Sequence, residues 1–328
     1  MPSFAKVTIH SSQLPDAVRR GLLESLRTRR INHKFHYDSA KQTTKWIALH
    51  QAFAPSRNDD DCARIYDAAF IAAAERIDAG AVHLVGLGCG GGRKDTRLLS
   101  LLKEKGKRVA YTPSDVSTAM VLVASETARG MVLEDDCHPL VCDLEMAEDL
   151  PEVLGNWIEA DEARVVTFFG MIPNFEPGMI LPRLASLLRR EDWLLFSANL
   201  APGANYEDGI RRVLPQYDNE LTRDWLMTFL LDMGVERADG ELRFVIEPDP
   251  AGSALKRIAA YFRFERARRV RVDGVEFEFR VGEAVRMFFS YRYTPGLVRE
   301  LLGGQGIGVV EQWVTKSGEE GVFLCRRG

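Results

Sequence analysis

The chain has 328 residues, a formal net charge of −4 at pH 7, and a composition that is 46% hydrophobic and 27% charged. This composition is typical of a soluble globular protein with a sizeable core in one large domain or two modest ones. The weak negative charge gives no general attraction to nucleic acid or anionic membranes, and no apolar stretch approaches the roughly 18–20 residues that span a bilayer. We therefore expect neither nucleic acid nor a membrane as a partner.

The cysteines and the first twenty residues indicate the compartment. Five cysteines, an odd number, do not form the dense framework of a disulfide-rich secreted protein. Residues 1–20 lack the uninterrupted apolar segment of a secretory signal. Cys137, His138 and Cys142 could be metal ligands, but small buried residues around a strand are the favoured interpretation, so we expect no metal. These features predict a cytoplasmic protein.

From residue 82 onward, apolar runs alternate with helical patterns. Before that point, residues 14–28 and 62–77 show apolar side chains at helical spacing. The apolar runs are residues 82–87, 108–116, 138–144, 163–170 and 192–200, and the helical patterns between them are 96–106, 117–130 and 177–190. This alternation predicts βαβ units and a mostly parallel sheet with both faces covered, which is a Rossmann-like α/β fold.

The pattern changes after residue 200. Interrupted helical segments precede residues 269–279, where Asp273-Gly274 is predicted to be the two-residue turn of a hairpin. Counting outward pairs Val272 with Val275, Arg271 with Glu276, Val270 with Phe277, and Arg269 with Glu278. Alternating arginine and glutamate favours a solvated sheet face over a nucleic-acid patch. Residues 294–304 predict a helix and residues 306–327 two strands, an antiparallel pair that closes the parallel sheet.

A glycine-dense turn follows the first predicted strand, where open α/β sheets bind their ligands. Glycine loses the most conformational freedom on folding, so its concentration here indicates a close approach or a backbone conformation that side chains forbid. Gly86, Gly88 and Gly90 are alternate glycines that suit the methionyl and ribose parts of S-adenosylmethionine (SAM). Gly86, Gly88 and Gly91 also satisfy the dinucleotide spacing, so an NAD-dependent oxidoreductase stays open at this point.

Two aspartates end the next two predicted strands. Asp115 lies where an acid would accept the ribose hydroxyls of either cofactor, and Asp143 lies where an acid could accept a hydrogen bond from an adenine amino group. The alternative for both residues is helix capping or turn formation. Asp143 and the antiparallel last strand favour SAM over NAD, the latter by analogy of fold.

Five segments of the chain match motifs of one family: KFHYDSA (34–40), the glycine segment 83–99, YTPSDVS (111–117), VCDLE (141–145) and FFGMIPNFEP (168–177). On these segments most of the chain resembles the histidine-specific SAM-dependent N-methyltransferases, which include the L-histidine Nα-methyltransferase of ergothioneine biosynthesis. The glycine segment is one residue longer than in the family. Residues 216–220, 269–279 and 290–293 occupy the places of later family motifs.

The resemblance implies a domain organisation. Residues 61–204 and 289–328 would form the SAM-binding methyltransferase core. Residues 1–60 and 205–288 would form a smaller α+β lobe that binds the substrate. A monomer is slightly favoured.

The resemblance also implies site residues. Gly86, Gly88, Gly90 and Asp115 would contact SAM, with Asp143 near the adenine. In the substrate site, Asn174 would hold the carboxylate or amine of an amino acid, Tyr37 and Tyr217 would line the pocket, and Ser290 is retained from the family pattern.

Two positions depart from the family. The glutamate that grips the imidazole ring falls on Phe288, and a second substrate tyrosine falls on Ala54. A phenyl ring cannot accept the hydrogen bond of an imidazole N–H, and a site without that acceptor does not discriminate for it. We therefore expect the substrate to be a less polar or aromatic amino acid, or a related amine, and not histidine.

The expected reaction is in-line displacement of the SAM methyl group by a nucleophilic nitrogen. Asn174 would accept a hydrogen bond from the amine and orient its lone pair, so no dedicated base is required. Tyr37 and Tyr217 would stabilise the developing ammonium through cation–π contacts. A SAM-binding relative without catalytic activity is an alternative, because expected substrate residues are replaced.

Overall fold

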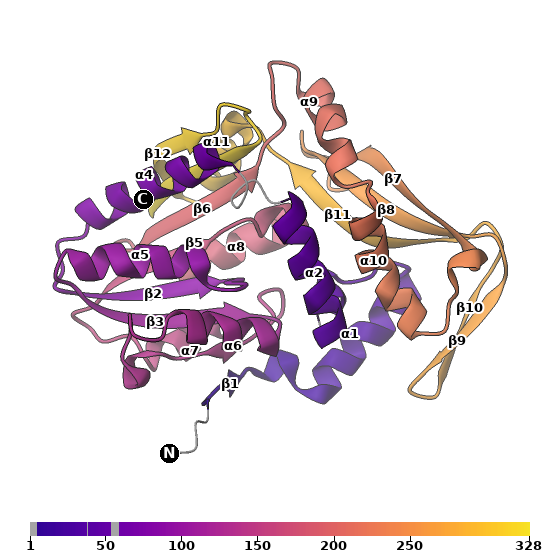
Figure 1. Ribbon diagram of the computed structural model, residues 1–328, viewed down its shortest axis with the longest axis horizontal. Helices are drawn as coiled ribbons and strands as arrows, with labels where there is room; N and C mark the ends of the chain where they lie inside the picture. Colours follow the sequence, from indigo (N-terminus) through magenta and orange to yellow (C-terminus); the bar gives the residue numbers. More distant parts are fainter. Residues whose placement is uncertain (1–4, 38, 54–58) are drawn as a thin grey trace. The chain divides into compact units, whose positions relative to one another are not determined.

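A computed structural model describes residues 5–37, 39–53 and 59–328 (Figure 1). Contacts divide the chain into two compact units, each assembled from separate segments. Unit 1 comprises Met1–Leu14, Asp59–Leu200 and Tyr293–Gly328, and unit 2 comprises Pro15–Asn58 and Ala201–Arg292. The assignment of the cofactor to one unit and the substrate to the other stays a prediction.

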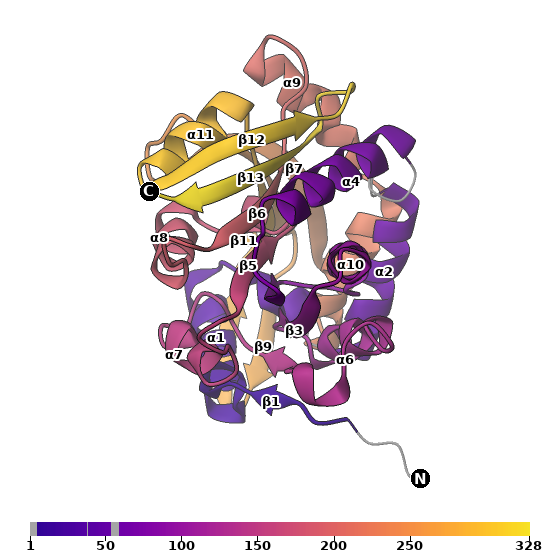
Figure 2. The same cartoon turned by 90° about the vertical axis from the view of Figure 1, so that its left-hand side faces the viewer.

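Unit 1 contains an eight-stranded sheet in the order β1-β4-β3-β2-β5-β6-β13-β12. The strands are β1 Thr8–Ile9, β4 Leu140–Val141, β3 Arg108–Asp115, β2 Ala81–Leu87, β5 Ala163–Phe168, β6 Trp193–Asn199, β13 Glu320–Arg327 and β12 Ile307–Val314. Neighbours from β1 to β6 are parallel, whereas β13 is antiparallel to both β6 and β12. Figure 2 shows β12 near one end of this sheet and β1 at the other. The predicted Rossmann-like fold with an antiparallel closing strand is confirmed.

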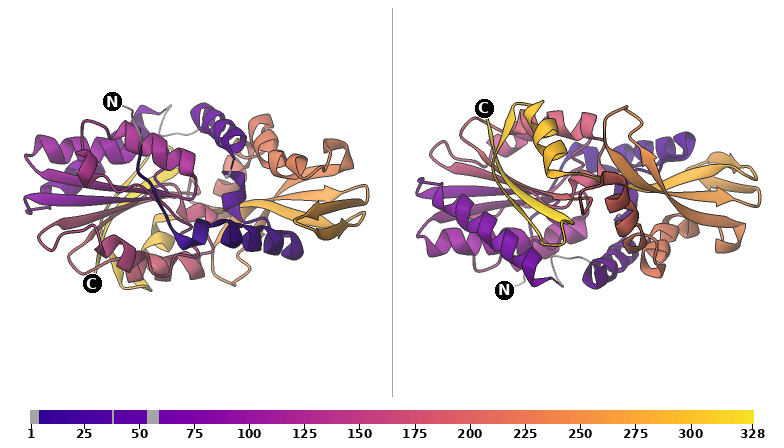
Figure 3. Two further views of the ribbon diagram at one scale, coloured as in Figure 1. Left: turned by 90° about the horizontal axis from the view of Figure 1, so that it is seen from below. Right: turned by 90° about the horizontal axis from the view of Figure 1, so that it is seen from above.

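Helices cover both faces of this sheet, as the views in Figure 3 show. They are α4 Asp60–Glu75, α5 Arg93–Glu104, α6 Thr118–Thr127, α7 Leu150–Gly155, α8 Pro177–Leu187 and α11 Pro295–Gly303. All seven residues of β2 are buried, as expected for a central parallel strand with apolar packing on both faces. The core between β2, β3, α4 and α5 includes Phe70, Leu98 and Tyr111.

Two details of unit 1 differ from the sequence-based expectation. Thr8–Ile9 forms a short strand parallel to β4, before the first predicted helix and where no strand was predicted. The third predicted strand spans only Leu140–Val141 as a strand. Two-residue strands carry too little alternation to be recognised from sequence.

Unit 2 combines helices with two antiparallel sheets. Its helices are α1 Pro15–Thr28, α2 Ala40–Phe53, α9 Tyr206–Val213 and α10 Glu220–Asp232, with short 3-10 helices η2 His33–His36 and η5 Leu214–Gln216. One sheet has the order β11-β8-β7, formed by Ala284–Arg292, Lys256–Phe264 and Gly240–Pro248. The other is the hairpin of β9 Arg268–Val272 and β10 Val275–Phe279.

The hairpin has the predicted register. Val272 pairs with Val275 and Arg271 with Glu276, and the turn residues Asp273 and Gly274 have φ of 48° and 81°. Both values are positive, as a two-residue turn of this hand requires. Val270 and Phe277 face the core of unit 2, so the turn fixes which side chains are buried.

A buried ion pair joins β5 to the segment that precedes β6. The Arg164 Nε donates to Asp192 Oδ2 at 2.8 Å, and the same oxygen accepts the Arg189 backbone N–H at 2.6 Å. Both charged side chains are almost fully buried. Loss of either charge would leave the other desolvated without a counter-charge.

We expect Asp192→Asn to lower the free energy of unfolding by about 3–5 kcal/mol, because it leaves the Arg164 guanidinium buried without its carboxylate. Urea denaturation measures this change. Asp208→Asn is the matched control, since Asp208 forms an exposed ion pair with Arg211, and its loss should cost less than about 1 kcal/mol. Equal effects of the two substitutions would contradict the argument.

Candidate functional site

The glycine turn between β2 and α5 uses backbone conformations that favour glycine. Gly88, Gly90 and Gly92 have φ of +59°, +52° and +69°, a region that most side chains avoid. A Cβ on Gly92 would lie 2.8 Å from the Ala124 Cα, so this glycine also lets α5 approach α6. Gly91 has neither requirement, because its nearest neighbour would be an ordinary 3.7 Å from a Cβ.

Gly91 has no packing role, and this helps to distinguish between NAD and SAM as the cofactor. In the dinucleotide fingerprint the third glycine permits close packing of the helix. Here Gly91 would have to supply that third glycine, yet the close approach is made at Gly92. This geometry disfavours the dinucleotide alternative.

The Asp115 carboxylate faces the glycine turn from the end of β3. Its Oδ2 accepts the Gly90 N–H at 3.0 Å, and its Oδ1 accepts the Ser117 N–H at 2.9 Å. Burial raises the pKa of this carboxyl, and the backbone N–H groups oppose that shift. Each carboxylate oxygen keeps a lone pair beyond these bonds, so the group could also accept ligand hydroxyls.

Gly86 has a structural explanation of its own. A Cβ at this position would collide with Asp95 Oδ2, which lies directly behind β2. Asp95 belongs to the first turn of α5 and accepts hydrogen bonds from Tyr111 (2.8 Å) and Thr167 (2.7 Å). Burial raises the pKa of Asp95 to about 6. Gly86 therefore makes room for a carboxyl that joins α5 to β3 and β5.

Met171 packs against the α-carbon of Gly88, and a Cβ on that glycine would lie 2.6 Å from its Cγ. Met171 precedes the short 3-10 helix η4 Ile172–Asn174, whose last residue is the predicted substrate residue Asn174. The Asn174 N–H donates to the Met171 carbonyl at 3.0 Å. The turn after β5 thus carries both Asn174 and a side chain that contacts the glycine turn.

Asp143 lies beside Asp115, because the Cys142 N–H donates to the Asp115 carbonyl at 2.9 Å. Its backbone N–H donates to Ser12 Oγ, and its Oδ1 accepts the Glu145 N–H, both at 3.0 Å. This carboxylate therefore stabilises a turn, which is the structural alternative that the sequence left open. A role at an adenine ring stays a prediction.

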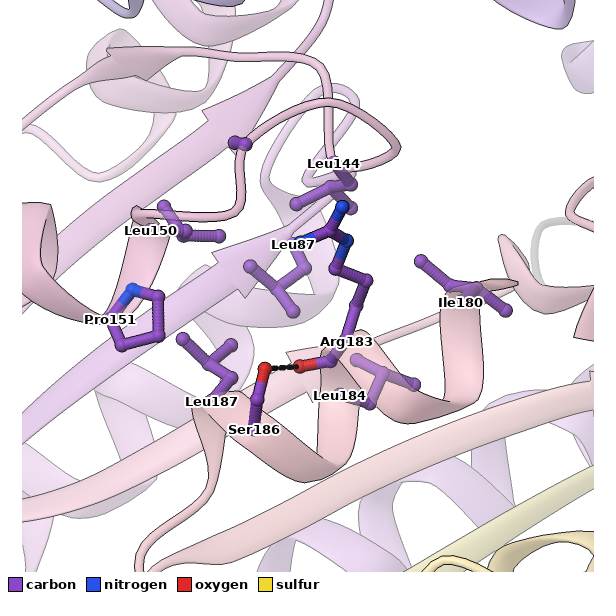
Figure 4. Close-up of a pocket in the computed structure, with 10 residues that line it drawn as sticks. Leu87, Leu144, Leu150, Pro151, Ile180, Arg183, Leu184, Ser186 and Leu187 are labelled. Atoms are coloured by element: carbon purple, nitrogen blue, oxygen red, sulfur yellow. Dashed lines mark hydrogen bonds between the residues drawn. The ribbon is translucent and has the colours of Figure 1, made fainter. Parts of the chain in front are cut away.

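A separate small pocket lies between α7 and α8. Figure 4 shows its apolar lining, which includes Leu87, Leu144 and Leu184, with the Arg183 side chain extending over it. Arg183 forms an ion pair with Glu148 at 2.5 Å. Leu87 ends β2 and Leu144 follows Asp143, so the pocket adjoins the candidate cofactor residues but does not include them.

In unit 2, three of the predicted substrate residues belong to one aromatic cluster. We call His33, Tyr37, Tyr217, Trp225 and Phe288 the Phe288 cluster. The Phe288 ring lies 5.1 Å from the His33 ring and 6.0 Å from both Tyr217 and Trp225, measured between centroids. Tyr37 lies 5.5 Å from Trp225. Phe288 and Trp225 are buried, whereas His33, Tyr37 and Tyr217 are partly exposed.

Polar groups border this cluster on one side. The Tyr217 hydroxyl lies 3.0 Å from Ser290 Oγ and accepts a hydrogen bond from Arg292 Nη2 at 2.7 Å. Arg292 is buried, and its guanidinium also lies over the Tyr217 ring. The predicted residues Tyr217 and Ser290 are therefore in direct contact. Ala54, the other departure noted in the sequence, lies outside the described residues.

Several residues of these sites were not predicted from the sequence. Asp95 and Met171 adjoin the glycine turn, and His33, Trp225 and Arg292 join the substrate candidates. An acid in the first turn of a helix usually serves its own helix, so the burial of Asp95 behind β2 gives no sequence signal. His33 and Trp225 come from distant segments, and no local pattern brings them together.

A family model described as histidine-specific, SAM-dependent methyltransferase matches residues 14–327 of the chain. The search of curated proteins found no match to the chain. Among the described residues, no helix is long and apolar enough to cross a membrane.

Solved structures with similar folds include the mitomycin 7-O-methyltransferase MmcR, with 15% identity over 97% of this chain and 70% of that one, and a TM-score of 0.43. The SAM-bound amino pentose methyltransferase CalS10 of Micromonospora echinaspora has 13% identity over 86% of this chain and 96% of its own, at a TM-score of 0.39. A possible exported protein of Bordetella parapertussis has 9% identity over 95% and 98%, at a TM-score of 0.48.

The raised pKa of Asp95 predicts a pH-dependent stability. Its folded value of about 6 exceeds the ordinary 3.8, so the folded protein holds a proton that the unfolded chain loses between about pH 4 and pH 6. The stability that this group contributes is therefore complete below that window and is lost as the pH rises through 6. Asp95→Asn does not titrate, so its free energy of unfolding relative to wild type should rise by about 3 kcal/mol between pH 4 and pH 7.

Urea denaturation at several pH values measures this difference. Asp67→Asn is a suitable control, because Asp67 is exposed and pairs with Arg97 on the surface. Its stability should follow that of wild type through the same window. Parallel pH profiles for wild type and Asp95→Asn would show that Asp95 is ionised in the folded protein like an ordinary aspartate.

Proposed function

Because the chain belongs to the family of histidine-specific, SAM-dependent methyltransferases, we propose that it methylates the nitrogen of an amino acid or related small amine other than histidine. Membership of this family shows that the protein is a SAM-dependent methyltransferase. The nitrogen acceptor and the exclusion of histidine are the proposal. The observation that carries it is the surroundings of Phe288.

The glycine turn supports the binding of SAM in unit 1. Gly88 and Gly90 give the turn its positive φ angles, and the Asp115 carboxylate is fixed at the same turn. These residues would hold the nucleoside, with Asp143 on the neighbouring strand end. When bound, SAM supplies a methyl group already activated by the sulfonium, so the protein provides position and electrostatics.

The substrate residues support an acceptor with an apolar or aromatic side chain. Phe288 stands where the family resemblance places the glutamate that grips an imidazole, and its ring neighbours are His33, Tyr217 and Trp225. Aromatic rings stack on one another favourably at such distances. These rings offer no carboxylate, so an imidazole N–H would lose the stronger, charge-assisted hydrogen bond that the glutamate of the family pattern provides.

The reacting amine would be oriented by polar and aromatic groups. The Asn174 side-chain oxygen can accept a hydrogen bond from the amine and direct its lone pair. Tyr37, partly exposed beside Trp225, can stabilise the positive charge that develops on nitrogen. An amine that enters in its neutral form needs no further base.

The substrate prediction is tested with methyl-labelled SAM and a panel of amino acids and amines. Aromatic and apolar members should be methylated at higher kcat/KM than histidine, because only they match the Phe288 cluster. Phe288→Leu should reduce this preference at least about tenfold, because the substrate loses a contact with an aromatic ring and part of the apolar surface of the Phe288 cluster. Phe264→Leu is the control, because Phe264 is also buried but stacks on Phe279 instead.

Two results would contradict the proposal. Histidine as the best substrate would show that Phe288 does not select against imidazole. Binding of SAM without methylation of any panel member would favour the non-catalytic alternative.

The cofactor residues are tested by Asp115→Ala. We expect SAM affinity to fall by about 1–3 kcal/mol, because a charged hydrogen-bond acceptor is lost. Isothermal titration calorimetry with SAM and with its demethylated product measures the change. Asp67→Ala serves as the surface control. Unchanged affinity in Asp115→Ala would remove Asp115 from the cofactor site.

A further inference from the structure

A buried polar cluster lies beneath the two loops that carry the candidate cofactor and amine residues of unit 1. Its centre is the hydroxyl of Tyr66, a residue of α4 that is only 4% exposed. This hydroxyl contacts Lys94 Nζ at 2.8 Å, Ser197 Oγ at 2.8 Å and Glu320 Oε1 at 2.5 Å. Ser197 and Glu320 are themselves buried.

The donors and acceptors of this cluster can be assigned. Lys94 is only a donor, and the Glu320 carboxylate is only an acceptor. Tyr66 therefore accepts from Lys94 and donates its single proton to Glu320, which leaves Ser197 as a second donor to the phenol oxygen. The strongly raised pKa of Tyr66, caused by burial and by Glu320, agrees with a phenol that keeps this proton.

Each branch of the cluster leads to a different part of the site. Lys94 is the second residue of α5, directly after the glycine turn, and its ammonium lies 4.0 Å from the Tyr66 ring centroid. Ser197 Oγ accepts the Gly170 N–H at 2.8 Å. Gly170 has φ of +69° and begins the segment that contains Met171 and Asn174. Glu320 holds the phenol from β13.

We propose that the Tyr66 hydroxyl is a positioning group for cofactor binding, because it fixes the glycine turn and the Gly170–Asn174 segment to one buried point. The two segments also touch directly, since Met171 packs on Gly88. A shift of either segment would therefore displace the surface against which SAM binds. Tyr66 itself is buried and acts through Lys94 and Ser197. This inference rests on SAM binding and does not depend on which amine is methylated.

The test is SAM affinity in Tyr66→Phe, measured by calorimetry, which needs no acceptor substrate. The phenyl ring preserves packing and the position of the Lys94 ammonium over the ring, so the loss is confined to the hydrogen bonds of the hydroxyl. We expect affinity to fall about tenfold, because the hydrogen bonds that hold Lys94 and Ser197 at the phenol oxygen are lost.

Tyr291→Phe is the matched control for a merely structural effect. Tyr291 is also buried, and its hydroxyl donates to the buried Asp249 carboxylate at 2.7 Å. Both phenylalanine variants lose a phenol–carboxylate bond, so both should lower Tm. Only Tyr66→Phe should weaken SAM binding.

Hydrogen exchange of the Gly170 amide gives a second readout. Ser197→Ala removes its acceptor and should speed exchange across residues 169–175, and Tyr66→Phe should do so to a smaller extent. If Tyr66→Phe does not fold, Ser197→Ala carries the test through SAM affinity, with a several-fold loss expected. A lowered Tm with wild-type SAM affinity and unchanged exchange would overturn the proposal. Normal SAM binding with no methylated amine would instead contradict the proposed function alone.

Discussion

The hydrogen bond from the Gly90 N–H to the Asp115 carboxylate is the contact on which the candidate cofactor site depends. It joins the turn after β2 to the end of β3, and it forms only because Gly88 and Gly90 adopt positive φ. The carboxylate is held by backbone groups rather than by other side chains, so its position follows from the sheet itself. A binding group fixed in this way needs little reorganisation when a ligand arrives.

Buried polar groups, rather than apolar packing alone, support the loops of this site. Asp95 joins α5 to β3 and β5, and Tyr66 joins α4, α5, β6 and β13. Such groups add little net stability, because each must be desolvated. They fix the positions of the loops, because a buried hydrogen bond tolerates far less displacement than an apolar contact. Desolvating these groups lowers the stability of the fold, and such a loss of stability is common near functional sites.

The sequence predicted those features that local patterns encode. The alternation of strands and helices, the antiparallel closing strand and the hairpin register follow from periodicity and from Asp273-Gly274, and the structure has all three. The position of Asp115 opposite the glycine turn could be predicted, because β2 and β3 are parallel neighbours whose carboxyl ends lie at the same edge of the sheet. The reason for Gly86 does not, because it depends on where Asp95 is buried. The Phe288 cluster joins residues from 33 to 288, and no periodicity reports such a contact.

Both units are built from segments far apart in the chain, which has a consequence for synthesis. In unit 1 strand β13 lies between β6 and β12, so a nascent chain presents the open edge of β6 until residues 320–327 emerge. In unit 2 the helices of residues 15–53 pack with α10, which is translated far later. Contacts between residues far apart in the sequence slow folding, and apolar surface stays exposed until they form. Loss of residues 320–327 would therefore leave β6 with an unpaired strand edge.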